Sequence, residues 1–312
     1  MTWSNYRHRF QSPHRLVPAR TEEPSTSLLS EGILDANVDR TEPNMIRVAL
    51  WREWQGMLAD LRNLGPVWSI VRNYQCVLAA SGDYPELAFS SDHLAAHGRE
   101  ADTTLTCHFP AWRRAAAFES GCCCGRLYGV EITNEQEQAI HRICLARDDA
   151  LDSFIEWTRM HQATGLEDEP EIVGHADEEH LHPQFFARHP GTLEVPADRL
   201  RTTLIHAAQR EIPLIASVAS EGATQTTRLD ITQASESRGW LILSGPGRSL
   251  YVDAAPAGTL LVEPSSTDGE PNLRLSLVDP NDHRLLHLRG VADDRPAWNQ
   301  LIREFVLCST IS

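Results

Sequence analysis

The sequence repeats itself at an offset of about half its length, and this repeat constrains the fold more than any other feature. Matching residues recur in the same order at offsets of 146 or 147, pairing Trp54 and Leu58 with Leu200 and Leu204, Pro66 with Pro213, and Leu127, Ile132 and His141 with Leu273, Val278 and His287. Two units of this size are too large to form a solenoid of short repeats. We therefore predict a tandem duplication of one α+β unit, with its copies related by a pseudo-twofold axis.

The order of the predicted elements supports the same division. Helical spacing around residues 51–64 is followed by β-branched, apolar segments typical of strands, and the same succession returns after residue 191. The acidic stretch between the two halves predicts a solvated linker. We predict a mobile arm with a short helix over 1–44, a first repeat over 45–161, an acidic histidine-containing linker over 162–190 and a second repeat over 191–312. Each repeat is expected to carry a large antiparallel sheet with flanking helices, and the two halves to form a central cleft that binds a ligand.

Charge and hydropathy exclude several classes of protein. The chain has 43 acidic and 28 basic residues, a net charge of −15, and this field repels phosphate backbones, so we expect no nucleic-acid binding. No apolar run approaches the ~18 residues of a membrane-spanning helix. The first 15 residues lack the apolar segment of a signal peptide. We therefore expect a cytoplasmic protein without membrane insertion, and the oligomeric state stays open.

The cysteines do not predict a disulfide framework. There are seven, an odd number, and three of them are adjacent at Cys122–Cys124. Neighbouring side chains of a strand point to opposite faces, so this run cannot converge on one metal ion. We interpret it as a connection between strands that contributes nothing to function. The sequence contains no self-sufficient catalytic motif.

Histidines gather in the acidic linker. One 15-residue window contains His175, His180, His182 and His189 beside Asp177, Glu178 and Glu179. Imidazole and carboxylate together are typical ligands of a metal ion. A solvated acidic linker that happens to contain histidine is the alternative interpretation, and the residues alone leave both open.

Several phrases of the sequence are similar to a known family. They are LGPVWSIVRN at 64–73, LTCHFPAWRRAA at 105–116, IPLIASVASEGATQ at 212–225 and GWLILSGPGRSLYV at 239–252. In these phrases the chain resembles the HemS/ChuS-type haemin-degrading (haem-utilisation) proteins, as a divergent member. The resemblance covers most of residues 45–310 and implies a cytoplasmic duplication of one antiparallel-sheet unit. It also implies haem as the ligand, in haem trafficking or reductant-dependent haem degradation for iron transport, with a reductant or a haem-uptake protein as partner.

The resemblance also implies a set of site residues. The family's iron ligand follows the linker, and two alignments of ADEEHLHPQFFARH place it at His180 or at His182. Family positions that face the haem correspond to His287 and Arg289. With Arg228 and Arg248, Arg289 is expected to receive the haem propionates, because guanidinium groups pair with carboxylates in a bidentate manner.

Two departures from the family favour an alternative function. Thr106 stands at the position of the family's distal arginine, and Glu263 stands in the phrase that brings positive charge to the propionates. A carboxylate there is expected to repel a propionate. The alternative is therefore a non-catalytic binding or scaffold protein that kept the duplicated fold and lost haem.

Overall fold

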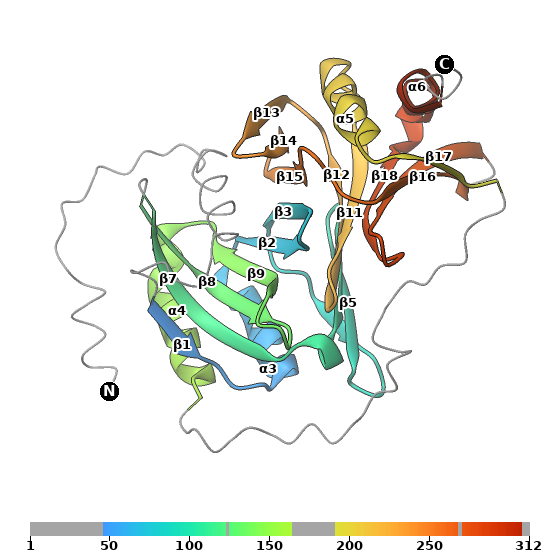
Figure 1. Ribbon diagram of the computed structural model, residues 1–312. Helices are drawn as coiled ribbons and strands as arrows, with labels where there is room; N and C mark the ends of the chain where they lie inside the picture. Colours follow the sequence, from blue (N-terminus) through green and yellow to red (C-terminus); the bar gives the residue numbers. More distant parts are fainter. Residues whose placement is uncertain (1–45, 123–124, 164–190, 268–269, 308–312) are drawn as a thin grey trace.

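The computed structural model describes residues 46–122, 125–163, 191–267 and 270–307 (Figure 1). Two nine-stranded antiparallel sheets account for most of this part of the chain. Sheet 1 has the order β1 (Ile46–Ala49), β7 (Arg114–Cys122), β8 (Gly125–Thr133), β9 (Ala139–Leu145), β2 (Val67–Arg72), β3 (Cys76–Gly82), β15 (Arg248–Asp253), β14 (Trp240–Gly245), β13 (Gln233–Ser237). Sheet 2 has the order β10 (Leu193–Pro196), β16 (Thr259–Thr267), β17 (Glu270–Val278), β18 (Arg284–Gly290), β11 (Leu214–Ala219), β12 (Ala223–Leu229), β6 (Thr103–His108), β5 (Ala95–Glu100), β4 (Leu87–Phe89).

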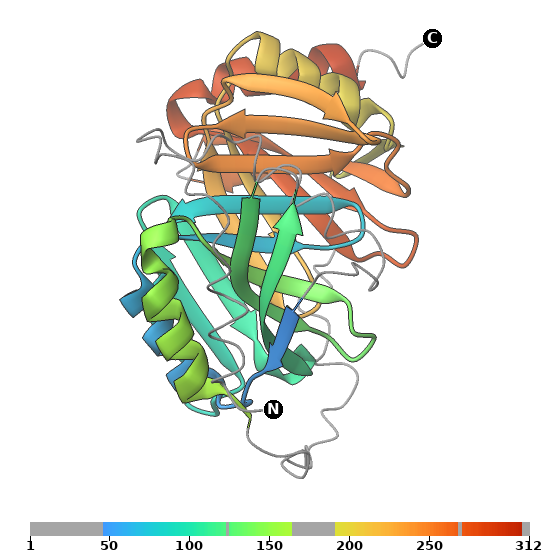
Figure 2. The ribbon, with the colours of Figure 1, turned by 90° about the vertical axis from the view of Figure 1, so that its left-hand side faces the viewer.

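Neither sheet belongs to one half of the chain. Strands β13 to β15 of the second half complete sheet 1, and strands β4 to β6 of the first half complete sheet 2, so that β6 lies beside β12 (Figures 1 and 2). Strand β1 has the place in sheet 1 that β10 has in sheet 2, and the same holds for each later pair up to β9 and β18. The predicted α+β class with large antiparallel sheets is confirmed. The equivalent strand order of the two sheets supports the predicted duplication. That each half contributes three strands to the sheet of the other half was not predicted.

One hydrophobic core lies between the two sheets and includes the helices. Within the described residues the α-helices are α3 (Trp54–Asp60), α4 (Leu151–His161), α5 (Arg199–Gln209) and α6 (Arg295–Ile302). In α5, Leu200, Leu204 and Ala207 recur at steps of four and three residues, and all three are buried. Burying one such leucine contributes about 2 kcal/mol of hydrophobic free energy. The inner faces of both sheets contribute to the same core cluster.

The two halves also meet through polar contacts at the centre of this core. The Ser69 hydroxyl of β2 donates to Oε1 of Gln225 on β12 at 2.7 Å, and the Gln225 amide donates back to the Ser69 carbonyl at 3.2 Å. Both side chains are buried. A buried amide left without partners would cost about 1–3 kcal/mol, so this reciprocal pair specifies how β2 and β12 pack.

The repeat is offset by 145 residues at the end of each half, and not by 146. Strands β8 and β9 carry a register shift beside Ile132, and β17 and β18 carry the equivalent shift beside Leu277. The equivalents of Leu127, Ile132 and His141 are therefore Asn272, Leu277 and Leu286. The predicted matches of these three residues at an offset of 146, His141 with His287 among them, are wrong. A shift of one residue moves a side chain to the other face of a strand. His141 accordingly lies in the core, whereas His287 is half-buried on the outer face of sheet 2.

Several local expectations can be compared with this architecture. The phrase SGPGRS is a hairpin between β14 and β15, as predicted, with Gly247 at a φ of +60°. Strand β7 ends at Cys122 and β8 begins at Gly125, and Cys123 and Cys124 of the cysteine run lie outside the described residues. Within the described part of the chain no helix is long and apolar enough to cross a membrane. The arm 1–44 and almost all of the linker 162–190 lie outside the described residues, and the proposed boundaries stay a prediction.

Candidate functional site

The side of sheet 2 that faces away from the core carries polar side chains, and we call it the open face. Strand alternation defines it: on β11, Leu214 and Ala216 are buried in the core, whereas Ile215 and Ser217 between them are half-exposed. The same alternation continues on β12 with half-exposed Thr226. Strands from both halves form this face, because β5 and β6 extend it beyond β12.

The register places three of the four predicted cofactor-binding residues on the open face. His287 lies opposite Ser217 of β11, and Arg289 lies two residues further along β18, opposite Ile215. Ile215 in turn lies opposite Arg228 of β12. Residues directly opposite one another project to the same face, so Arg228, His287 and Arg289 are neighbours on one surface. Sequence analysis did not predict Arg274 of β17, which lies directly opposite Arg289.

The fourth predicted residue, Arg248, lies elsewhere. It is the first residue of β15 in sheet 1, and its Nε donates to the Thr227 hydroxyl at 2.8 Å. Thr227 is fully buried on the inner face of β12 and also contacts the Thr103 hydroxyl at 2.9 Å. Arg248 therefore joins the two sheets on the core side, and the structure does not bring it together with the other three.

Glu263 is the centre of a buried ionic cluster beside the open face. Both of its oxygens accept from the Arg284 guanidinium at 2.7 Å, and Oε2 also accepts from Arg274 at 3.1 Å and from Ser276 at 2.8 Å. Burial alone would raise the pKa of Glu263, but these hydrogen bonds and the two positive charges lower it to about 2.

The cluster corrects the expectation that Glu263 repels a propionate. One carboxylate with two guanidinium groups leaves a net charge of +1. Glu263 itself is fully buried, whereas the Arg274 side chain is one-third exposed. The solvent-accessible part of this cluster is therefore cationic, and its field attracts an anion.

His287 is held as a neutral imidazole next to this cluster. Its Nδ1 lies 2.8 Å from the Ser276 hydroxyl, whose single proton is donated to Glu263. Nδ1 must then be the donor in that contact, which leaves the lone pair on Nε2. Burial and the charges of Arg274 and Arg284 lower the pKa of His287 to about 3. The ring is thus neutral at pH 7 in a form that can accept a hydrogen bond or ligate a metal ion.

Thr106 and His97 lie at the other end of the open face. Both are exposed, and Nδ1 of His97 on β5 lies 3.0 Å from the Thr106 hydroxyl on β6. Sequence analysis found Thr106 as a departure from the family but missed His97. No sequence motif signals His97, because only the pairing of β5 with β6 brings the imidazole beside Thr106.

Arg228 is a surface residue with a local partner. Its Nε donates to the Asp230 carboxylate at 2.9 Å, and the side chain is 42% exposed. The hydrogen bond and the negative charge of Asp230 raise its pKa. An exposed pair of this kind contributes little to stability and leaves the remaining donors of the guanidinium accessible to a ligand.

The two predicted metal ligands, His180 and His182, lie outside the described residues. Within the described ranges, no group of three or more His, Cys, Asp or Glu side chains is arranged to hold a metal ion. Among the described residues, the open face carries the imidazole of His287 and, at its other end, that of His97.

The fold is similar to solved structures of haem proteins. Crystal structures of the haem-binding protein PhuS from Pseudomonas aeruginosa match over 97% of this chain and 96% of theirs, with a TM-score of 0.69 and 18% identity for the holo form. The haem-degrading enzyme ChuS from Escherichia coli O157:H7 matches over 97% of both chains, with a TM-score of 0.68 and 14% identity. No protein-family model and no curated protein sequence matches the chain. The resemblance predicted from the sequence phrases is confirmed, and the chain has the fold of PhuS and ChuS.

Proposed function

We propose that this protein binds haem on the open face of sheet 2, for haem or iron utilisation. The observation that carries the proposal is the convergence of Arg228, Arg274, Arg289 and neutral His287 on that face. They converge in a fold that the chain shares, over nearly its whole length, with a haem-binding and a haem-degrading protein.

The residues present fit the chemistry of haem. Its propionates are carboxylates, and the half-exposed guanidinium groups of Arg274 and Arg289 offer bidentate charge-assisted hydrogen bonds. The pairing of Glu263 with Arg284 keeps that carboxylate from opposing them. The apolar part of the porphyrin would lie against Ile215 and the methyl groups of Thr226 and its neighbours on β6. This is an amphipathic surface, as a small-molecule site requires.

The iron ligand belongs to the proposal as well. We assign it to His180, with His182 as the alternate, because an imidazole following the linker is where the family resemblance places it. Bound haem would supply redox chemistry and oxygen activation. The described residues would fix its orientation, with His287 offering Nε2 as an acceptor on the same face.

A carrier role without haem degradation is the second candidate. The observation that favours it is Thr106, which presents an exposed hydroxyl at the position of the family's distal arginine. The proposal further includes a cytoplasmic location and transfer of haem from an uptake protein, and, if haem is degraded, an external reductant.

A haemin titration tests the proposal. Wild-type protein should shift the Soret band and saturate at one haemin per chain. The double variant His180→Ala/His182→Ala should lose the ligated spectrum. Arg289→Ala should keep that spectrum and bind more weakly. Arg62→Ala is a matched control. Arg62 is also a half-exposed arginine, and it pairs with Glu86 at 2.8 Å, but it does not lie on the open face.

The outcomes separate the two candidates. If wild-type protein leaves the Soret band unchanged, haem binding is wrong. If haemin binds but is not consumed when ascorbate is added, the carrier role is correct and degradation is wrong. If the double histidine variant keeps the wild-type spectrum, another residue is the iron ligand.

A further inference from the structure

The outer face of sheet 1, the side that faces away from the core, is apolar and buried. We call the side chains on it the outer cluster, and Trp68, Ile70, Phe118, Ile242 and Tyr251 are among its members. All members come from strands of sheet 1, and each is at most 9% exposed. Side chains stand roughly perpendicular to a sheet, so neighbours on one face cover their flanks but not their tips. The outer cluster is therefore buried only because something lies across it.

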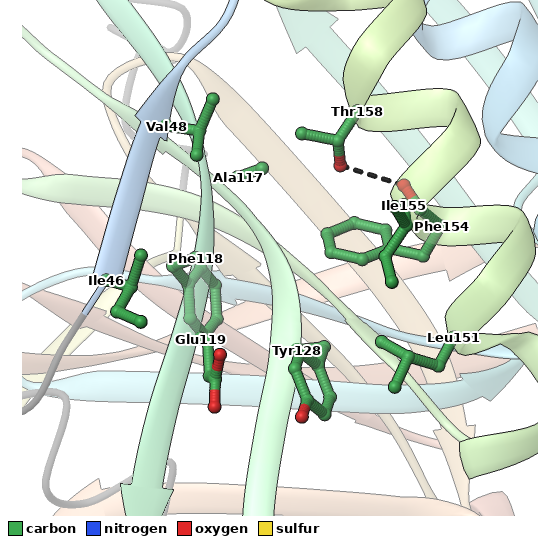
Figure 3. A pocket seen from close by; sticks show the side chains of 10 residues that line it. All are labelled: Ile46, Val48, Ala117, Phe118, Glu119, Tyr128, Leu151, Phe154, Ile155 and Thr158. Atoms are coloured by element: carbon green, nitrogen blue, oxygen red, sulfur yellow. Dashed lines mark hydrogen bonds between the residues drawn. The ribbon is translucent and has the colours of Figure 1, made fainter. Parts of the chain in front are cut away.

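No described element outside sheet 1 supplies this cover. Among the described residues, the outer cluster consists of side chains of this sheet alone. The four described α-helices contribute to the core instead. Figure 3 shows helix α4 on the inner side of sheet 1, where Val48, Ala117 and Tyr128 face it across a small, mostly apolar space. The cover must come from a part of the chain outside the described ranges or from a second molecule.

Buried arginines give the same face an excess of positive charge. Glu131 of β8 pairs with Arg142 of β9 and, at 2.8 Å, with Arg47 of β1. Arg72 follows Ile70 by two residues on β2, so it projects to the same face. Arg72 is 8% exposed, and burial together with the charge of Arg142 lowers its pKa to about 10. These three guanidinium groups and one carboxylate have a net charge of +2, which favours an acidic cover.

One stretch outside the described ranges has the matching composition. Residues 21–39, TEEPSTSLLSEGILDANVD, contain five acidic residues and no arginine. The sequence predicts a short helix within this stretch. Leu29 and Ile33 are four residues apart, and so are Leu34 and Val38, which places the members of each pair on the same side of a helix. The stretch therefore offers both apolar side chains for the outer cluster and carboxylates for its arginines.

The place of this stretch in the chain also fits. It precedes β1, the edge strand of sheet 1, and β2 lies four strand spacings from β1, about 19 Å away. Residues 39–45 span up to about 24 Å when extended, which is enough to bring residues 21–39 over β2. The other long stretch, residues 164–190, leads to β10, the edge strand of sheet 2. Each stretch thus enters the sheet beside which it is expected to lie.

We propose that residues 21–39 of the same chain lie across the outer face of sheet 1. Their leucine and isoleucine side chains cover the outer cluster, and their carboxylates lie beside Arg72 and Arg142. Burial of apolar surface drives the contact, and the carboxylates offset the cost of keeping two guanidinium groups away from water. The chain itself then closes this face to a ligand.

Photo-crosslinking of the full-length protein locates the segment. With p-benzoylphenylalanine in place of Ile33, a product of monomer size should form, and mass spectrometry should find the crosslink in peptides of β2, β3 or β9. The same probe in place of Val17, earlier in the arm, is the matched control and should give no such crosslink. Hydrogen exchange tests the contact without a probe. The amides of residues 27–38 should exchange at least about tenfold more slowly than those of residues 5–17.

A second variant tests whether the segment covers the outer cluster. Ile33→Asp/Leu34→Asp places charges where the apolar contact is proposed, so it should release the segment. The slow exchange of residues 27–38 should be lost, and bis-ANS fluorescence should rise because apolar surface becomes accessible. Leu16→Asp/Val17→Asp is the matched control, since it places the same charges elsewhere in the arm and should change neither measurement.

Four results would overturn the proposal. Crosslinks from position 33 to strands of sheet 2 would place the segment elsewhere, and crosslinks found only in a product of dimer size would make a second copy the cover. Unprotected amides at residues 27–38 of wild-type protein would show that the segment does not dock. Unchanged bis-ANS fluorescence in the Ile33→Asp/Leu34→Asp variant would assign the cover to residues 164–190. None of these results bears on haem binding, which is proposed for the other sheet.

Discussion

The outer face of sheet 1 and the open face of sheet 2 occupy equivalent places in the fold and have opposite character. On sheet 1 the outer face carries a second apolar cluster of buried residues, which includes Trp68, Ile70, Phe118, Trp240, Ile242 and Tyr251. On sheet 2 the equivalent strands carry the half-exposed or exposed polar residues Ser217, Thr226, His97 and Thr106. The common strand order thus supports two different surfaces.

Individual positions show how the difference arose. The register of the paired strands makes Phe118 equivalent to the Glu263 position, and Ile242 and Tyr251 equivalent to His97 and Thr106. Each substitution replaces an apolar side chain on sheet 1 by a polar one on sheet 2. A strand exposes alternate residues to each face, so one face can change its chemistry while the core face stays apolar. The comparison teaches that the backbone order and the surface chemistry are independent of each other.

Both faces nevertheless contain a buried ionic cluster, and removing its carboxylate should have the largest effect. Glu263→Ala removes the carboxylate that accepts from both terminal nitrogens of Arg284, whose side chain is only 3% exposed. We expect a loss of about 3–5 kcal/mol in the free energy of unfolding, measured by urea denaturation. Glu131→Ala on sheet 1 should cost less. Its partner Arg47 is 45% exposed and can be rehydrated, although Arg142 is buried. An equal loss in both variants would contradict this reasoning.

The second-largest effect is expected from truncating equivalent apolar residues on the two faces, which should destabilise the protein to different extents. Trp68 of β2 is 5% exposed, and Trp68→Ala should cost about 3 kcal/mol of stability because it leaves a cavity. Its equivalent on sheet 2, Ile215, is half-exposed, so Ile215→Ala should cost about 1 kcal/mol. Thermal unfolding of the two variants measures both values. A larger loss of stability in Ile215→Ala than in Trp68→Ala would show that the outer face of sheet 1 is not the better packed of the two.

The two histidines, one near the end of each half, predict a pH dependence. Burial lowers the pKa of His141 to about 4, and burial with neighbouring positive charge lowers that of His287 to about 3. Below the ordinary value near 6.5 the unfolded chain takes up protons that the folded chain refuses, so stability is present above pH 6.5 and is lost as the pH falls toward 3–4. Each histidine contributes a slope of up to about 1.4 kcal/mol per pH unit.

Single variants sharpen this prediction. His287→Gln and His141→Gln should each flatten the slope of stability between pH 6.5 and 4.5, measured by urea denaturation at several pH values. Below about pH 4.5 the wild-type protein should lose further stability. The depressed pKa of Glu263, about 2, contributes stability only while that carboxylate is ionised. A slope that neither substitution changes would show that other groups control acid unfolding.

The smallest expected effect concerns ligand binding by equivalent residues. Arg289 on the open face corresponds in register to Cys144 on sheet 1. Arg289→Ala should weaken haemin binding about tenfold, since it removes a charge-assisted bond to a propionate. Cys144→Ala should leave haemin affinity unchanged. A weaker complex in the cysteine variant, measured by the same Soret titration, would assign haem to the other sheet.

Much of the fold could be predicted from the sequence because its signals are local. The helical spacing around Trp54 and Leu58, the proline before each of β2 and β11, and the Gly-rich hairpin before Arg248 all depend on a few adjacent residues. The periodic return of these signals predicted the α+β duplication. The same signals carried the resemblance that the fold confirms.

The sequence by itself therefore determined the class of the fold and the succession of its elements. Tertiary structure alone decided the rest, since it depends on contacts between distant residues. The exchange of β4–β6 and β13–β15 between sheets is one such case. The one-residue shift that separates His287 from His141 is another, and it rests on a bulge that no composition signals. Arg284 neutralises Glu263 from 21 residues away, and this pairing forms only once the strands have packed. The space under α4 likewise exists only once the helix has packed on its sheet. Side-chain chemistry is written in the sequence, but charge balance and cavity volume are properties of the packed molecule.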